Sequence, residues 1–165
     1  LYINFTITTL DPDLARGLEP KAPTPALRLA AMQTLTQAGI RCGVIASPVL
    51  PGINDTEPEL LALAQQAKTH GAQWFGGGVL FLKSPTKEVF LNYLDRDHAH
   101  LVPRYQATYK QSARPSRDYH QQIEARFDAI RNQTNLGRRA TPYLPAEVET
   151  GHLLSLRLYS SVNSP

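Results

Sequence analysis

The chain has 165 residues and a formal net charge of +3, and 42% of its residues are hydrophobic while 19% are charged. This balance is typical of a globular domain with a core, and it excludes a chain that is disordered throughout. No apolar run approaches the roughly 20 residues that a membrane helix needs. The single cysteine, Cys42, excludes an internal disulfide. We therefore expect a cytoplasmic protein in a reducing compartment, with no membrane partner.

The start of the chain lies inside an apolar run, Leu1 to Ile7, and the only methionine is Met32. No turn or cap precedes this run, so we expect a fragment of a larger domain. The alternative is a processed terminus. The run has neither the basic flank nor the small-residue cleavage site of a signal peptide.

The first elements alternate between strand and helix patterns. β-branched and aromatic residues predict a strand over Tyr2–Ile7, and a helical turn is possible at Asp13–Leu18. Thr24 followed by proline predicts a helix that runs to about Ala38. Its apolar stripe is expected at Leu27, Ala31, Leu35 and Ala38.

A short apolar run at Cys42–Ala46 predicts a strand that is covered on both faces. Prolines without an N–H group, beginning with Pro48, should stop any regular ladder. Thr56, with Glu59 three residues later, predicts a capping box at the start of the next helix. Its buried side is expected at Leu60, Leu61, Ala64 and Ala67.

The third strand is expected within Gln73–Leu82, with Val79–Leu82 as its clearest part. Glycine at all three positions of Gly76–Gly78 weakens a strand unless another backbone or a ligand approaches closely. The order β-α-β-α-β predicts a parallel sheet with helices packed outside. Three strands leave both edges bare, so further strands must come from elsewhere.

Helical patterns follow the third strand. We expect one helix from Ser84-Pro85, a short one over Leu101–Gln111, and a longer one that Ser116 caps and Asn135 ends. The segment from Arg104 to Arg139 carries a net charge of +5, so nucleic-acid binding is one interpretation. A solvated helix face is the other.

Several motifs together resemble the second half of a radical SAM domain, closest to the spore photoproduct lyase-like branch. They are T-I-T-T-L-D-P at 6–12, L-E-P-K-A-P-T-P at 18–25, R-L-A-A-M at 28–32, A-G-I at 38–40 and S-P-V-L-P-G-I-N-D at 47–55. The resemblance implies an α/β fold: a half TIM-type barrel of parallel strands, followed by a helical C-terminal extension. The implied divisions are 1–96 for the half-barrel, 97–137 for the extension and 138–165 for an irregular tail.

The resemblance also implies part of a pocket for S-adenosylmethionine. Thr6 and Thr8 would offer hydroxyls, although plain strand threonines are an equal alternative. Arg28 would either bind the SAM carboxylate or brace the loop by pairing with Glu19. The remaining implied residues, which would line the adenine or order the loop, are Ala46, Ser47, Pro48, Asn54, Leu80 and Leu82. Core packing alone also explains the two leucines.

The complete family holds a [4Fe–4S] cluster on three cysteines and cleaves SAM reductively to a 5′-deoxyadenosyl radical. Cys42 cannot supply that ligand set and is interpreted as a small buried residue. We therefore expect no metal ligand and no catalytic residue in this chain, which would be inactive without the missing N-terminal half of the barrel. The alternatives are a non-catalytic half-barrel that pairs with another chain, and a nucleic-acid-binding module.

Overall fold

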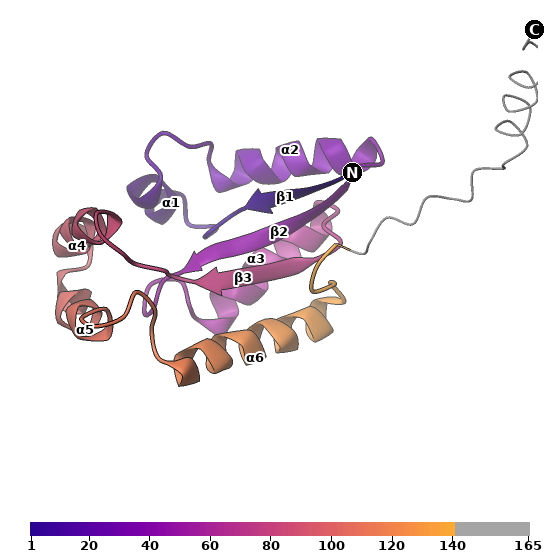
Figure 1. The fold of residues 1–165 in the computed structure, drawn as a ribbon. Helices are drawn as coiled ribbons and strands as arrows, with labels where there is room; N and C mark the ends of the chain where they lie inside the picture. The colour runs from indigo at the N-terminus through magenta and orange to yellow at the C-terminus, as the bar shows by residue number, and fades with distance from the viewer. Residues whose placement is uncertain (141–165) are drawn as a thin grey trace, which may run out of the picture.

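The computed structural model describes residues 1–140, which form an α/β unit around a three-stranded parallel sheet of order β1-β2-β3 (Figure 1). The elements in chain order are β1 (Tyr2–Thr6), α1 (Pro12–Leu18), α2 (Pro25–Gln37), β2 (Arg41–Val49), α3 (Glu57–Thr69), β3 (Phe75–Val79), α4 (Thr86–Asp97), the 3-10 helix η1 (Ala99–Leu101), α5 (Val102–Thr108) and α6 (Arg117–Thr134). The predicted βαβαβ order with parallel strands is therefore confirmed. None of the helices in residues 1–140 is long and apolar enough to cross a bilayer.

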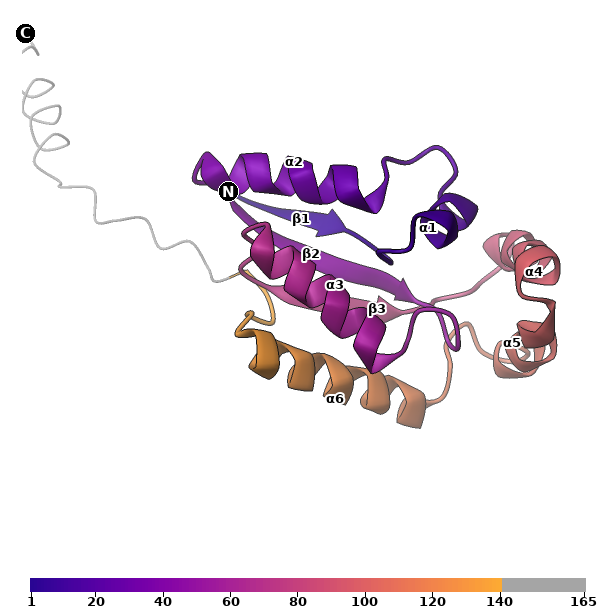
Figure 2. The ribbon, with the colours of Figure 1, turned by 180° about the vertical axis from the view of Figure 1, so that it is seen from behind.

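One face of the sheet is covered by α2, α3 and α6. Alternate residues of β2, namely Cys42, Val44 and Ala46, are buried in one core with side chains from these three helices. Figure 2 shows α3 in front of the sheet, whereas Figure 1 looks onto the opposite face, over which no described helix lies. We call that opposite side the open face. The expectation that Cys42–Ala46 would be covered on both faces is not met within the described residues.

The end of the open face nearer the strand starts is filled by Trp74. Its indole N–H donates to Asn4 Oδ1 at 2.8 Å, and its ring meets the Tyr2 ring edge-on. The indole lies so close to Gly43 that a Cβ there would come within 2.2 Å of it. At the other end of this face, where the strands finish, Ile45 lies between Thr6, Ser47, Gly76 and Gly78.

The sheet-facing side of α2 differs from the predicted stripe. Pro25, Leu29 and Met32 are buried, while Leu27 is 61% exposed and Ala31 and Ala38 are exposed as well. Of the predicted stripe only Leu35 contributes, and it is partly buried. The stripe was wrong because two apolar series run along this helix at similar spacings, and the sheet selects the one that begins at Pro25.

Pro48 interrupts the regular ladder of β2, as the sequence predicted, but it does not end the strand. The strand continues to Val49 through an irregularity in its pairing with β3 between Ala46 and Val49. A proline is tolerated there because an irregular step in the ladder leaves one N–H position unused. Thr56 also differs from its prediction, since its hydroxyl bonds the Glu59 carboxylate and caps no backbone N–H of α3.

The buried side of α3 is close to the predicted one. Leu60, Ala64 and Ala67 are buried as expected, but the fourth fully buried position is Leu63, while Leu61 is only partly buried.

β3 ends at Val79, so the strand predicted over Val79–Leu82 is wrong beyond its first residue. The N–H of Leu80 still donates to Val49 O, but Leu82 donates to Ala113 O at 2.8 Å. The chain leaves the sheet because both leucines enter a second core. Its other buried residues come from the loop after β2, from α4, η1 and α5, and from the residue that follows α5: Leu50, Leu94, Leu101, Tyr105 and Tyr109.

The predicted ends of α6 are confirmed. Ser116 Oγ accepts from the N–H of Tyr119, and Asn135 closes the helix with a left-handed φ of 54°. Ile123, Phe127 and Ile130 of α6 belong to the first core, together with the sheet. The division at residue 96 stays a prediction, but α6 packs on the sheet and does not stand apart from it. The predicted tail, 138–165, lies almost wholly outside the described residues, as do residues Leu153–Tyr159, whose sequence pattern suits either a strand or a helix.

The two alternating faces of β3 give the first prediction. A Cβ at Gly77 would lie 2.2 Å from Phe127 Cζ and 2.5 Å from the Ala46 carbonyl oxygen, whereas a Cβ at Gly78 would meet Ser47 Oγ at an ordinary 3.5 Å. We expect Gly77→Ala to lower the free energy of unfolding by about 1–3 kcal/mol through overpacking. The matched control Gly78→Ala should change it by less than about 0.5 kcal/mol. Urea denaturation measures both, and equal losses would contradict this assignment of faces.

The second core makes stability depend on pH in the alkaline range. Burial raises the pKa of Tyr109, whose hydroxyl donates to Leu80 O, to about 12. Between about pH 10 and pH 12 the unfolded chain loses this proton while the folded chain keeps it, so the free energy of unfolding should fall as pH rises through this window. Tyr109→Phe should make that fall shallower in denaturation curves recorded from pH 8 to pH 11.5. An unchanged slope in the variant would show that Tyr109 is not the group responsible.

Candidate functional site

The ends of the three parallel strands meet at one edge of the sheet. Thr6 and Thr8 lie at the end of β1, Ser47 and Pro48 lie near the end of β2, and Leu80 follows β3. In parallel α/β folds this is the edge at which ligands bind. The segments that follow the three strands therefore share one edge, although their side chains do not all face the same space.

Asn54 ties the loop after β2 to the end of β1. It is 2% exposed, and its Oδ1 accepts from the N–H of Leu50 at 2.6 Å. Its Nδ2 donates to Thr8 O at 2.9 Å and to Pro48 O at 3.3 Å. Asn54 therefore orders this loop, as the sequence predicted, while a direct role in ligand binding stays a prediction.

Arg28 braces the connection that follows β1. Its Nη2 pairs with Glu19 Oε2 at 2.8 Å, its Nε donates to Pro23 O at 3.1 Å, and its Nη1 donates to Thr6 O at 2.6 Å. The structural alternative raised for this arginine, a pair with Glu19, is therefore realised. A contact between Arg28 and a ligand carboxylate stays a prediction, because the guanidinium has five N–H donors and these bonds occupy three.

The two threonines at the end of β1 differ in environment. Thr8 is buried and donates to Ser47 O at 3.2 Å, whereas Thr6 is exposed on the open face. A hydroxyl that already donates to a carbonyl keeps only its acceptor capacity for a ligand. Thr6 is therefore the freer of the two hydroxyls at this edge.

Three predicted residues have side chains in the cores. Ala46 faces the covering helices in the first core, and Leu80 and Leu82 lie in the second. The structure does not bring these side chains to the open face, and core packing accounts for all three. That these three residues line a pocket remains a prediction, and only their backbone groups would contact a ligand there.

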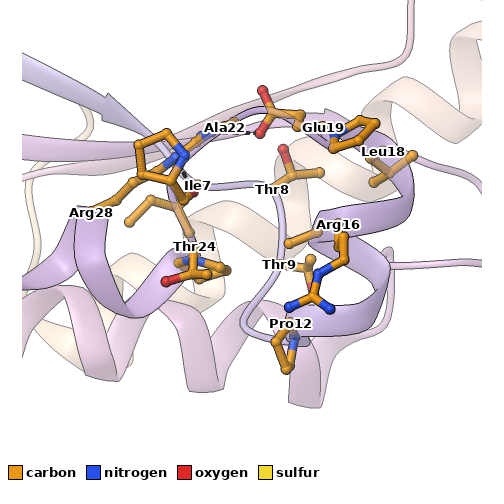
Figure 3. Close-up of a pocket in the computed structure, with 14 residues that line it drawn as sticks. Ile7, Thr8, Thr9, Pro12, Arg16, Leu18, Glu19, Ala22, Thr24 and Arg28 are labelled. Atoms are coloured by element: carbon orange, nitrogen blue, oxygen red, sulfur yellow. Dashed lines mark hydrogen bonds and ion pairs between the residues drawn. The ribbon is translucent and has the colours of Figure 1, made fainter.

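Two small hollows lie beside these residues. One, between β1 and α1, has a volume of about 50 Å³ and includes Thr8 and Arg28 in its wall (Figure 3). The other, against α3, has a volume of about 150 Å³ and includes Thr8 and Asn54. Both are smaller than the roughly 300–1,000 Å³ of small-molecule pockets. Neither hollow alone holds a ligand as large as a nucleoside.

Gly76 and Gly78 leave room on the open face. A Cβ at Gly76 would come no closer than 3.5 Å to Arg138 O, and one at Gly78 no closer than 3.5 Å to Ser47 Oγ. Unlike Gly77, these two glycines have no steric neighbour in the described chain that requires them. In the sequence, the glycine triplet was the signal that could indicate a close approach to β3. Strand alternation then assigns Gly77 to the covered face and the other two glycines to the open face.

Ligands for a metal cluster are absent from residues 1–140, which contain no group of three or more His, Cys, Asp or Glu side chains that could hold a metal ion. Cys42 is fully buried in β2, and burial raises the pKa of its thiol. A raised pKa opposes the thiolate form that ligation needs. A cluster held by three thiolates therefore does not fit the described residues.

Comparison with known proteins finds longer relatives of this chain. Uncharacterized protein Rv2578c of Mycobacterium tuberculosis (strain H37Rv) is 32% identical over 140 residues, which are 85% of this chain and 40% of that protein. Uncharacterized protein Mb2609c of Mycobacterium bovis gives the same values. Uncharacterized protein ORF301 of Acidianus two-tailed virus is 33% identical over 51 residues, 31% of this chain and 17% of that protein.

The chain thus spans about 40% of the length of the mycobacterial relatives that it matches. No family model matches it. No solved structure matches it either.

The hydrogen bonds of Asn54 give a prediction at this edge. Asn54→Ala leaves the Leu50 N–H and the Thr8 carbonyl without their partner in a buried place. We expect the free energy of unfolding to fall by about 1–3 kcal/mol. The control is Asn92→Ala on the exposed side of α4, which should change little. A denaturation midpoint that is the same for both variants would contradict the role of Asn54 as the loop tether.

Proposed function

We propose that this chain is the C-terminal half of a radical SAM partial barrel of the spore photoproduct lyase-like branch. The observation that carries the proposal is the open face: the parallel sheet has helices on one face only, and the other face, where the strands finish, carries Thr6, Ile45, Ser47 and two glycines. Purely parallel sheets are normally covered on both faces. A barrel supplies that second cover, because its inner face packs against the inner faces of the remaining strands.

The missing barrel units would precede β1. In residues 1–140, β1 and β3 are the edge strands of the sheet, and β1 is the edge at which earlier strands of a barrel would pair. The mycobacterial relatives contain more than twice the matched length, which is room for further βα units. The partner that we propose for this chain is therefore the N-terminal half of the same barrel.

For a bound S-adenosylmethionine, the residues at the open end of the sheet fit in part. Thr6 and Ser47 would offer hydroxyls, and Gly76 and Gly78 would let the ligand approach the β3 backbone. Asn54 and Arg28 would act through the loops that they hold. When bound, SAM supplies the carbon-centred radical of these enzymes; the residues of this chain would position the ligand and exclude water.

The [4Fe–4S] cluster does not fit the described residues, because Cys42 is the single cysteine of the sequence and is buried. The cluster ligands would therefore lie in the missing half. Alone, the chain would be inactive. A non-catalytic half-barrel that pairs with another protein is the alternative that the same unpaired β1 edge favours. The single buried cysteine suits the cytoplasm, which we propose as the compartment.

The proposal is tested on the longer protein, expressed with the sequence that precedes Leu1. After anaerobic reconstitution with iron and sulfide, we expect cluster absorbance and formation of 5′-deoxyadenosine from SAM, measured by liquid chromatography. Gly78→Val should lower that formation by about 100-fold because its side chain fills the open face. Ala31→Val, which adds bulk on the exposed side of α2, should leave it unchanged.

A longer protein that binds no cluster, or that carries a cluster and forms no 5′-deoxyadenosine, contradicts the proposed function. The first of these outcomes, with a stable complex between this chain and another protein, would favour the interaction module. Full activity of Gly78→Val would place the ligand elsewhere.

A further inference from the structure

A groove of about 530 Å³ lies between the loop after β2, α5 and the start of α6, which sit next to each other in both ribbon views (Figures 1 and 2). Two prolines form its apolar part. Its other lining residues carry cationic or hydroxyl groups: Arg104, Thr108, Ser112, Arg114, Ser116 and Tyr119. We call it the arginine groove. Its volume lies in the range of small-molecule sites.

No carboxylate lines the arginine groove, and within residues 1–140 neither Arg104 nor Arg114 forms an ion pair. The Arg114 guanidinium lies 5.4 Å from the centre of the Phe81 ring, which positions it by a cation–π contact. The Arg104 guanidinium lies above Gly52, where a Cβ would come within 3.1 Å of its Nη1. Both arginine side chains are exposed, so their charged N–H donors can reach a ligand in the groove.

The hydroxyl groups of the groove differ in whether they already take part in hydrogen bonds within the protein. Ser116 Oγ accepts from the N–H of Tyr119 as the cap of α6, and the Tyr119 hydroxyl donates to Asp55 Oδ2 at 2.7 Å. Ser112 Oγ accepts from the N–H of Arg114 at 3.0 Å, which leaves its own proton to donate. Two guanidinium groups beside free hydroxyl donors form the donor set that recognises a phosphate.

The distribution of charge favours a single phosphate over a nucleic-acid backbone. In the basic segment from Arg104 to Arg139, Arg131 pairs with Asp128 and Arg138 pairs with Glu124. Arg126 donates to the carbonyl oxygen of Asp55. Of the other basic residues, Arg104, Lys110, Arg114 and Arg117 lie toward the groove end of the segment, and Arg139 lies at its far end. The segment therefore does not present the long cationic track that several successive phosphates need.

We propose that the arginine groove binds the phosphate group of a small phosphorylated molecule. Arg104 and Arg114 bind its oxygens by charge-assisted hydrogen bonds, and Ser112 and Thr108 donate from the groove wall. The positive end of α6, an 18-residue helix, lies beside the same space and adds to the attraction for an anion. This site shares no residue with the proposed SAM site, so it stands or falls independently of the radical SAM proposal.

The test uses the 165-residue chain and three probes: inorganic phosphate, a sugar phosphate monoester and a 12-nucleotide single-stranded DNA. Binding is followed by ³¹P NMR line broadening for the first two and by fluorescence anisotropy for the third. We expect both small probes to bind, and Arg104→Gln and Arg114→Gln each to weaken them by about 10-fold or more. Thermal unfolding midpoints of the variants report whether the fold is kept.

The matched control is Arg117→Gln, which removes the same charge from the first residue of α6 but does not line the groove. It should weaken binding by less than about 2-fold. An equal loss in the control would show diffuse attraction to a basic surface and overturn the proposal. So would tight binding of the DNA with no binding of the small probes, which would assign the groove to nucleic acid. Absence of binding by all three probes to the folded chain also overturns it.

Discussion

The packing of α2, α3 and α6 against a single face of the sheet is the constraint on which the rest of this structure depends. It divides each strand into residues that fill a core and residues that do not. In β2 the buried residues are Cys42, Val44 and Ala46. On the same side of β3, Phe75 is buried and the Phe127 ring packs over Gly77. The burial of these apolar groups stabilises the unit, so it fixes which side chains remain for the open face.

The order and type of the elements were predictable because they rest on local signals. Thr24 before Pro25, Ser116 before α6 and Asn135 after it mark helix ends through their own backbone preferences and hydrogen bonds. The choice between Leu27 and Leu29 as the buried residue of α2 was not local. Both series suit a helix, and only the position of the sheet decides between them.

The errors at strand ends have the same origin. Leu80 and Leu82 read as strand because their composition suits one, but the second core competes for them and draws the chain out of the sheet. Pro48 makes the ladder irregular, as expected, but the strand continues to Val49 beyond it. In both cases the outcome depends on tertiary neighbours that are far away in sequence.

The candidate site was predictable in its chemistry and less so in its geometry. The Arg28–Glu19 pair and the ordering of the loop by Asn54 follow from residue types that are common in such loops. The sequence did not show on which face of the sheet each residue lies. Ala46 was therefore predicted to line the pocket, although its side chain faces the helices. For the glycine triplet, the sequence indicated a close approach; the structure adds that Phe127 fills the space over only one of the three.

Trp74 has a consequence for the direction from which the open face is reached. Its ring lies on the open face where the strands begin. The indole donates a hydrogen bond to Asn4, and it fits there because Gly43 has no side chain. A molecule that approaches the open face over the strand starts meets the indole, whereas one that approaches over the strand ends meets Thr6, Ile45, Ser47 and the backbone of Gly76 and Gly78. Trp74 therefore leaves only the half of this face near the strand ends for a ligand.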